Sequence, residues 1–203
     1  MKADLASFTR QWPYLGLLGG LVLAVCANGA RCGEEAAVAT TPRVADVVYV
    51  ATPHDVVARM LSLAQIDSDT LVYDLGCGDG RVVATAARAY GCRGMGFDIS
   101  PERVAESRET VQKYGVSDRV QIAEQDIFEL DLTPANVITL YLLPRLNVRL
   151  IPQLDKLQPG SRIVSHDFDM EGVEPDRVVE MVSKEDGVEH TIYVWTTPLK
   201  KTE

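Results

Sequence analysis

The stretch Asp74-Leu75-Gly76-Cys77-Gly78-Asp79-Gly80 decides the fold that we predict for this chain. It follows residues 70–73, Thr-Leu-Val-Tyr, whose β-branched and aromatic side chains predict a buried strand. Residues 81–90 come next, with apolar side chains at helical spacing and Gly91 placed to end a helix. The glycines therefore occupy a strand-to-helix turn. In an open parallel sheet a ligand meets the backbone at such a turn, because glycine has no β-carbon and the helix N–H groups point at the ligand.

The spacing of the glycines distinguishes between classes of ligand. A dinucleotide-binding fingerprint has the form G-x-G-x-x-G, whereas this chain has D-x-G-x-G-x-G followed by Arg81. A Rossmann dehydrogenase is therefore a poor match. The pattern resembles the first motif of the class I methyltransferases that depend on S-adenosylmethionine (SAM). The resemblance implies that SAM is the methyl donor and that its amino-acid end is held by Asp74 and the loop residues Gly76, Cys77, Gly78 and Gly80.

Two more acidic residues follow the ends of later predicted strands. Residues 92–97 predict the second strand, and Asp98 at its end is placed to bind a ribose diol through carboxylate hydrogen bonds. Residues 120–124 predict the third strand, and Asp126 follows it. In class I methyltransferases an acidic residue at this point accepts the adenine amino hydrogen. The resemblance gives Asp126 that role, with Ile99 and Ile127 as walls of the adenine site.

The segment before the first strand is expected to cover this site. Residues 47–51 are extended, and Thr52-Pro53-His54-Asp55 predicts the start of a helix with Thr52 as its N-cap. In the methyltransferases that this chain resembles, the loop entering this helix covers the SAM pocket. The resemblance makes Tyr49 and Thr52 candidates to lie over the cofactor. For Thr52, capping alone is the alternative.

The reacting end of the site is expected at the carboxyl end of the fourth strand, residues 136–141. Methyltransferases acting on DNA bases, and some acting on glutamine, carry Asn/Asp-Pro-Pro-Tyr there to hold a planar nitrogen. This chain has Tyr141-Leu-Leu-Pro instead, which weakens a base- or amide-methylating assignment. Tyr141 is a candidate acceptor contact, or a core residue. His166 and Asp167 follow the fifth strand at the same edge and are candidates for a general base or substrate clamp, against a purely structural role.

The end of the chain departs from a regular crossover pattern. Residues 162–165 predict the fifth strand, and only residues 170–176 separate its polar end from the sixth. A parallel crossover needs about a dozen residues or more, so the usual helix must be missing or reduced. Residues 178–182 and 190–196 predict an antiparallel hairpin. We therefore predict an α/β fold, a doubly wound Rossmann-like methyltransferase sheet with a C-terminal antiparallel hairpin and a curtailed connection between strands five and six.

Several motifs together resemble a narrower group, the small seven-strand lysine methyltransferases that modify mitochondrial membrane carriers and the ATP synthase rotor, and their prokaryotic relatives. These motifs are Tyr-Val-x-Thr-Pro at 49–53, Asp-Leu-Gly-Cys-Gly-Asp-Gly-Arg at 74–81, Leu-Leu-Pro at 142–144 and the curtailed end. The resemblance implies in-line methyl transfer to a nucleophile held at the carboxyl edge of the sheet, with a lysine of a membrane protein as one acceptor. A small-molecule acceptor and a non-catalytic SAM-binding protein are the alternatives.

Composition limits the partners of the chain. Its 203 residues carry a net charge of −9, which argues against nucleic acid because binding rests largely on Lys and Arg that neutralise phosphates. The four cysteines form no Cys-x-x-Cys or Cys/His cluster in the sequence, so no metal site is expected.

Residues 1–40 are predicted to lie outside the methyltransferase domain, which we place at 41–203. The segment 11–30 carries no charged residue. Its apolar centre favours either a signal peptide or a membrane anchor, followed by a linker. The sequence thus predicts a protein that is membrane-anchored or exported, with the side of the membrane left open.

Overall fold

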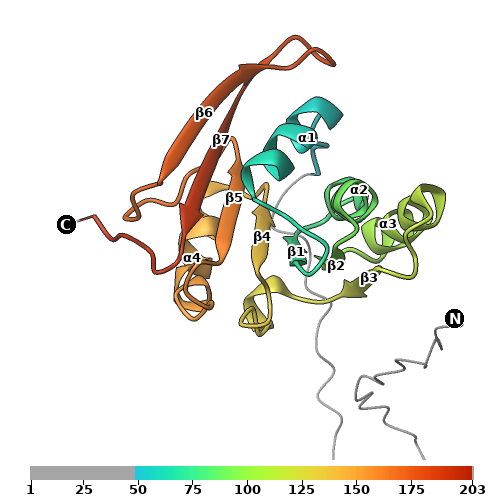
Figure 1. The fold of residues 1–203 in the computed structure, drawn as a ribbon, viewed down its shortest axis with the longest axis horizontal. Helices are drawn as coiled ribbons and strands as arrows, with labels where there is room; N and C mark the ends of the chain where they lie inside the picture. The colour runs from blue at the N-terminus through green and yellow to red at the C-terminus, as the bar shows by residue number, and fades with distance from the viewer. Residues whose placement is uncertain (1–48, 203) are drawn as a thin grey trace, which may run out of the picture. The chain divides into compact units, whose positions relative to one another are not determined.

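The computed structural model of the protein describes residues 49–202, and Figure 1 shows its helices and strands. The helical elements are α1 (His54–Leu63), α2 (Arg81–Tyr90), α3 (Pro101–Tyr114), the 3-10 turn η1 (Ile127–Glu129) and α4 (Pro144–Leu154). The strands are β1 (Leu71–Leu75), β2 (Arg93–Asp98), β3 (Val120–Glu124), β4 (Val137–Leu140), β5 (Arg162–His166), β6 (Arg177–Val182) and β7 (Glu189–Thr196). Each strand and helix predicted from the sequence is present, with ends shifted by a few residues at most.

All seven strands form one sheet in the order β3-β2-β1-β4-β5-β7-β6. Strands β1 to β5 run parallel to one another, and β7 runs antiparallel to both β5 and β6. The order reverses between β1 and β4. Ligands of open α/β sheets bind outside the carboxyl ends of the strands at such a reversal. The glycine-rich stretch begins at the carboxyl end of β1, so the topology places it at this point.

Helices cover both faces of the sheet, which confirms the doubly wound architecture. Because successive residues of a strand point to opposite faces, Leu71, Tyr73 and Leu75 pack in one cluster with the apolar side of α4. Val72 packs in a second cluster on the other face, together with α1 and α2. A third cluster joins α2 to α3. Apolar packing on both faces therefore supports the strands whose carboxyl ends form the edge with the glycine-rich stretch.

The connection from β5 to β6 holds no helix, as predicted from its length. β6 and β7 form the expected antiparallel hairpin at one edge of the sheet, and Figure 1 shows it on the opposite side of the sheet from β3. The indole N–H of Trp195 on β7 donates to the carbonyl of Val173 at 3.2 Å, so the short connection is held against the hairpin.

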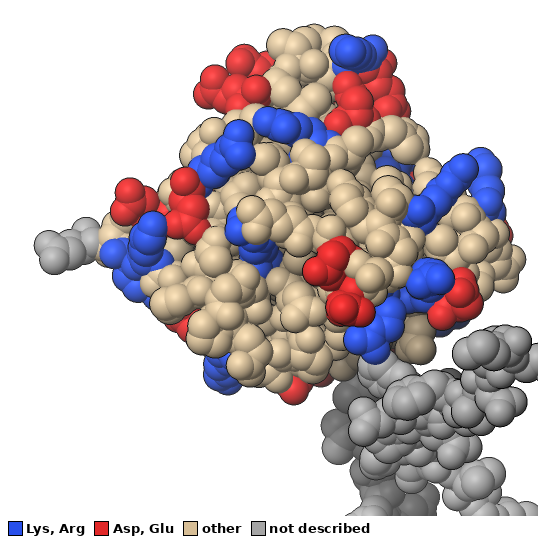
Figure 2. Space-filling view, in the orientation of Figure 1, with Lys and Arg blue, Asp and Glu red and all other residues tan. Residues whose placement is uncertain are grey.

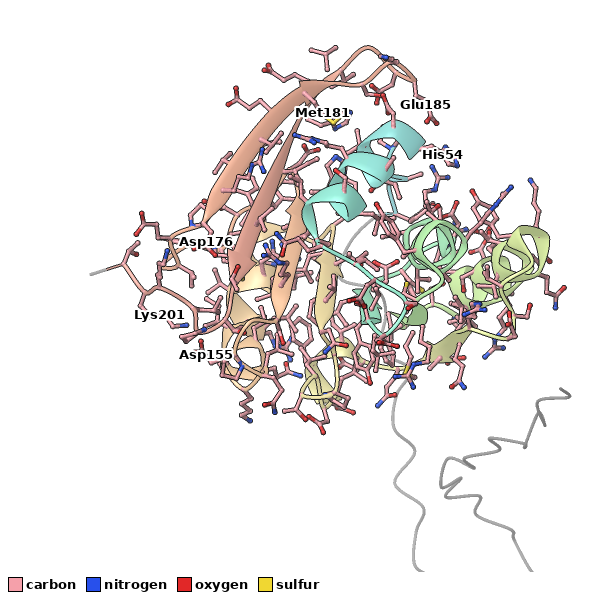
Figure 3. All side chains as sticks on the ribbon, in the orientation of Figure 1. His54, Asp155, Asp176, Met181, Glu185 and Lys201 are labelled. Atoms are coloured by element: carbon pink, nitrogen blue, oxygen red, sulfur yellow. The ribbon has the colours of Figure 1, made fainter. Side chains whose placement is uncertain are left out.

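The turn of this hairpin contacts the start of α1. A carboxylate oxygen of Glu185 accepts the backbone N–H of His54 at 2.6 Å, and Figure 3 shows these two residues facing each other. The carboxylate of Asp55 accepts the hydroxyl of Ser183 at 2.9 Å and the backbone N–H of Lys184 at 2.7 Å. The last strands therefore fix the end of α1 that carries the segment 49–53.

One local prediction is wrong. Thr52 does not cap α1, whose N-cap is Pro53, because the Thr52 hydroxyl bonds to a ring nitrogen of His166 at 3.1 Å instead.

Pro152 lies inside α4, and the helix continues past it to Leu154. Proline at this position removes one backbone hydrogen bond in the last turn only, and the apolar face of the helix stays packed on the sheet.

The predicted localisation must be corrected. A search of residues 49–202 for a helix long and apolar enough to cross a bilayer found none. A membrane-anchored or exported protein is therefore not supported. The segment 11–30, on which that prediction depended, lies outside the described residues, and so does the predicted domain boundary at residue 41.

Candidate active site

The glycine-rich loop lies between β1 and α2, as predicted. The backbone N–H groups of Gly76 and Cys77 both donate to the carbonyl of Phe97, at 2.9 Å each, and tie the loop to the end of β2. The φ angles of Gly76, Gly78 and Gly80 are +75°, +55° and +76°. This left-handed region is strained for residues with a β-carbon, which explains why the loop alternates glycine with other residues.

Gly78 also lies against the ring of Tyr49. A β-carbon built on Gly78 would stand 2.2 Å from the Cε2 atom of Tyr49, well inside van der Waals contact. The guanidinium of Arg103 lies over the same ring, 4.7 Å from its centroid. Tyr49 therefore lies on the glycine loop, held there by a cation–π contact.

We expect Gly78→Ala to displace Tyr49 and to weaken SAM binding by about tenfold or more, because the new methyl group meets the ring and the φ angle is strained by about 1–2 kcal/mol. Calorimetric titration with SAM measures the effect. Gly172→Ala is the matched control, since Gly172 has a φ of +83° and open space around its Cα. Equal SAM affinities in the two variants would contradict the packing described here.

The three acidic residues stand at the carboxyl ends of three neighbouring strands. Asp74 ends β1 and is 5% exposed. Its Oδ1 accepts the hydroxyl of Thr139 at 2.7 Å, while its Oδ2 is buried without a hydrogen-bond partner among the described residues. Burial raises the pKa of Asp74 to about 7, and the neighbouring Asp79 and Asp98 carboxylates add to the rise. A buried carboxylate with one unused oxygen is a site for a cation or hydrogen-bond donor from a ligand.

Asp98 and Asp126 are each held by backbone N–H groups. Asp98 Oδ2 accepts the N–H of Gly78 at 3.0 Å, and Oδ1 accepts that of Ser100 at 2.9 Å. The carboxylate thus bridges the glycine loop and the start of α3. Asp126 caps the turn η1, because its Oδ1 accepts the N–H of Phe128 at 3.0 Å. Both side chains have fixed orientations toward the cleft.

A cleft of about 1000 Å³ runs along this edge of the sheet. Most of the residues predicted from the sequence to contact the cofactor line it: Tyr49, Thr52, Asp74, Gly76, Cys77, Asp98, Ile99, Asp126 and Ile127. Gly78 and Gly80 belong to the loop but do not line the cleft. Tyr141 lines it as well, at the end of β4. The structure therefore brings together residues spread over half of the sequence.

His166 and Asp167 lie behind Tyr141 and do not line the cleft. The rings of Tyr141 and His166 are 4.0 Å apart between centroids, and the Tyr141 hydroxyl donates to Asp167 Oδ2 at 3.4 Å. His166 is completely buried, and burial lowers its pKa to about 4, so the ring is neutral at pH 7. Neither residue is therefore placed to touch an acceptor in the cleft, and both contact Tyr141, which is.

Other residues of the site were missed from the sequence. The Arg81 guanidinium pairs with the Asp79 carboxylate at 2.7 Å and donates to the carbonyl of Thr52 at 2.9 Å. This pair ties the segment 49–53 to the glycine loop, a contact that the sequence motif ending in Arg81 did not predict. Asn147, fully buried on α4, donates to the carbonyls of Phe168 and Asp169 and fixes the turn after β5. A lone Asn in an apolar helix face was the available signal.

Comparisons with known proteins place this site in a family. A model of the ANTKMT methyltransferase domain matches residues 74–177. The protein-lysine N-methyltransferase of Saccharolobus islandicus strain REY15A is 43% identical over 152 residues, which are 73% of this chain and 92% of that protein. The chain belongs to the family of the ANTKMT methyltransferase domain.

Two further relatives agree with the family. A Caenorhabditis elegans protein named as a lysine N-methyltransferase of ATP synthase is 30% identical over 165 residues, 76% of this chain and 86% of that protein. A crystal structure described as that of an RNA methyltransferase from Salinibacter ruber in complex with S-adenosyl-L-homocysteine is 46% identical, with a TM-score of 0.70, and covers 76% of this chain and 97% of that one. This methyltransferase is therefore a SAM-dependent enzyme, and the alternative of a non-catalytic SAM-binding protein is rejected.

The residues of the cleft fit SAM. The unused oxygen of Asp74 suits an ammonium group, and the backbone of the glycine loop leaves room for an uncharged thioether chain. The apolar side chains of Ile99, Ile127 and Phe128 line the same cleft next to Asp126. The cleft thus offers a carboxylate for the SAM ammonium and apolar side chains for the adenine ring.

Proposed function

We propose that this methyltransferase transfers the SAM methyl group to the side-chain amine of a lysine in a protein. The observation that carries the proposal is the end of β4, where Tyr141 lines the cleft and stacks on Phe168 with 6.0 Å between ring centroids. Aromatic walls suit an alkyl chain that ends in an amine. The names of the Saccharolobus and Caenorhabditis relatives, both lysine methyltransferases, support the same acceptor.

We assign one part of SAM to each of the three acidic residues Asp74, Asp98 and Asp126. We place the SAM ammonium against Oδ2 of Asp74 and the backbone of Gly76, Cys77, Gly78 and Gly80. The ribose hydroxyls donate to Asp98, and the adenine amino group donates to Asp126. Ile99 and Ile127 flank the adenine, and Tyr49 and Thr52 cover the cofactor. When bound, SAM supplies a methyl group already activated on its sulfonium, so the protein mainly has to align the acceptor and exclude water.

The acceptor is held beyond the glycine loop. The Tyr141 hydroxyl donates a hydrogen bond to Asp167 Oδ2 at 3.4 Å, which leaves its oxygen lone pairs to accept an N–H of the acceptor amine. Burial of a lysine side chain in this cleft lowers the pKa of its ammonium and favours the neutral, nucleophilic amine. His166 and Asp167 act through Tyr141 as positioning residues, because neither lines the cleft.

RNA is the acceptor named for the Salinibacter protein, and it is the alternative to exclude. On the face shown in Figure 2, the Lys and Arg side chains lie in small groups among Asp and Glu and form no continuous basic surface. Nucleic-acid binding without such a surface is weak at physiological salt. This face therefore offers no basic surface for RNA, and labelling decides between RNA and protein as the acceptor at the cleft, which is itself lined by Arg81, Arg103, Arg145 and Arg149.

Methyl-labelled SAM tests the proposal directly. The purified protein is incubated with membrane protein, soluble protein, RNA and small-molecule fractions of the cells that produce it. We expect label in protein, and the fraction that carries it tells whether the acceptor is a membrane protein. Label only in RNA or only in the small-molecule filtrate would overturn the lysine assignment.

Tyr141→Phe is expected to lower kcat by about tenfold or more while SAM affinity stays unchanged, because the hydroxyl orients the acceptor and not the cofactor. The measurement combines initial rates on the labelled protein fraction with calorimetric titration of SAM. Tyr114→Phe, on α3 and outside the cleft, is the control. A loss of SAM affinity equal to the loss in kcat would show that Tyr141 belongs to the cofactor site.

A further inference from the structure

The antiparallel pairing of β5 and β7 brings two histidines together. His166 ends β5 and pairs with Ile192 in the register, so His190 lies two residues further along the neighbouring strand. Asp167 follows His166 with a φ of +58°, and its Oδ1 accepts the backbone N–H of Thr191 at 2.9 Å. Both imidazoles are buried, with exposures of 0% and 7%. The turn thus directs one carboxylate oxygen at two buried rings.

Three ligand atoms converge at this point. His166 Nε2 and His190 Nδ1 are 2.9 Å apart, and Asp167 Oδ2 lies 3.3 Å from each of them. Nitrogen and oxygen donors about 2.0–2.1 Å from a tetrahedral zinc ion stand about 3.3 Å from one another. Two sides of the triangle, 3.3 Å each, match this separation, and the third side, 2.9 Å, would open by a few tenths of an ångström around an ion that lies off the plane of the three atoms.

The other nitrogen of each ring has a partner of its own. His166 Nδ1 is 3.1 Å from the hydroxyl of Thr52, and His190 Nε2 is 3.2 Å from the carboxylate of Asp186. Metal-binding histidines are oriented in the same way, because the second N–H is given to a carboxylate or another oxygen. If each ring carries its proton on this outer nitrogen, the three converging atoms present lone pairs to one another, and a cation between them would stabilise the arrangement.

We propose that His166, His190 and Asp167 bind a divalent transition metal ion, with zinc as the first candidate. The ion would join the end of β5 to β7 behind Tyr141, whose hydroxyl donates a hydrogen bond to Asp167 Oδ2 at 3.4 Å. Two histidines and one carboxylate match the ligand preference of zinc. The site departs from the expectation of no metal, because strand pairing unites ligands that show no local spacing in the sequence.

The site is tested by metal titration of the full chain after removal of metals with a chelator. We expect one Zn²⁺ per chain by calorimetry. With Co²⁺ we expect visible absorption of tetrahedral intensity and no sulfur-to-cobalt charge-transfer band, since no cysteine belongs to the ligand set. His190→Ala removes both signals, whereas His54→Gln, at an exposed histidine, keeps them.

Asp186→Asn provides a milder variant for which folding is not in question, because Asp186 lies in the exposed hairpin turn. We expect it to weaken Zn²⁺ affinity by about 10–100-fold through loss of the outer carboxylate. Asp169→Asn, an exposed acid of the neighbouring turn, leaves the affinity unchanged. Absence of binding in the unaltered chain, or equal affinities in the Asp186 and Asp169 variants, overturns the proposal, and the three residues then share protons in a hydrogen-bonded cluster instead.

The metal site and the lysine acceptor stand independently. The titrations need no methyl acceptor, so they give the same answer whatever the substrate of the enzyme is. Conversely, the metal-free protein can be assayed for methyl transfer to lysine. Activity without metal would leave the proposed function intact. Together with Zn²⁺ binding in the titrations, it would give the ion a structural role.

Discussion

Asp98→Ala is expected to lower SAM affinity by at least about a hundredfold. Each hydrogen bond to a charged group contributes about 1.5–3 kcal/mol when it is made in full, and the carboxylate is placed to accept two ribose hydroxyls. The substitution also removes the acceptor for the N–H groups of Gly78 and Ser100, which lie 3.0 and 2.9 Å from the carboxylate oxygens. The glycine loop and the start of α3 therefore lose their common anchor along with the ribose contact.

Calorimetric titration with SAM and with S-adenosylhomocysteine measures this effect. Glu124→Ala is the matched control, because Glu124 is an exposed acid that pairs with Asp98 in the β2–β3 register and does not line the cleft. An unchanged SAM affinity in the Asp98 variant would remove the ribose assignment. It would also call into question the cofactor roles of Asp74 and Asp126, which rest on the same arrangement.

Asp74→Asn is expected to abolish SAM binding and at the same time to stabilise the protein without ligand at pH 8. The pKa of Asp74 is raised to about 7 in the folded state, chiefly by burial, from an ordinary value of 3.8. A group whose folded pKa is raised contributes stability below its unfolded pKa, and this stability is lost as pH rises through the folded pKa. The unliganded protein should therefore lose stability between about pH 4 and pH 7, on the order of 4 kcal/mol.

The asparagine variant carries no charge at this position and should not show that loss. Thermal unfolding of both proteins at pH 5 and pH 8, without SAM, measures it. We expect the Asn variant to have the higher Tm at pH 8 and a smaller difference between the two pH values. A lower Tm for the variant at pH 8 would mean that the buried carboxylate is stabilised by contacts other than the Thr139 hydroxyl.

The same carboxylate gives SAM binding a pH dependence. Below pH 7 the protonated Asp74 cannot pair with the SAM ammonium, so affinity should fall about fivefold from pH 7 to pH 6 and about tenfold for the next pH unit. Above about pH 8 the amino group of SAM itself begins to lose its proton. We therefore expect the highest affinity between these limits. A SAM affinity that is constant between pH 5.5 and pH 7.5 would place the ammonium elsewhere.

The position of the cleft and several of the residues that line it could be predicted from the sequence, because these residues lie where strands end. Asp74, Asp98 and Asp126 follow three successive strands, and a parallel sheet brings the carboxyl ends of its strands to one edge. The glycine pattern then separates SAM from a dinucleotide. These signals are local in the sequence, so residue pattern and spacing were sufficient to place these residues at one edge of the sheet.

The contacts that could not be predicted join segments far apart in the sequence. Thr52 has the residue type and position of an N-cap, yet its hydroxyl bonds to His166, 114 residues away. The lack of a continuous helix between β5 and β6 was visible in the sequence, but the meeting of His166 with His190 follows from the antiparallel register of β7. Arg103 reaches the ring of Tyr49 only because α3 packs beside the glycine loop. Long-range pairing of this kind leaves no periodic pattern in the chain.

We propose above that the protein transfers methyl groups from SAM to lysine side chains. The most direct measurement is amino-acid analysis of protein labelled by the purified enzyme with methyl-labelled SAM, followed by mass spectrometry of its peptides. We predict that the label is recovered as methylated lysine, and that the Asp98→Ala variant leaves none. Label recovered in arginine, glutamine or a carboxylate ester, or in nucleotides of copurified RNA, would contradict the account.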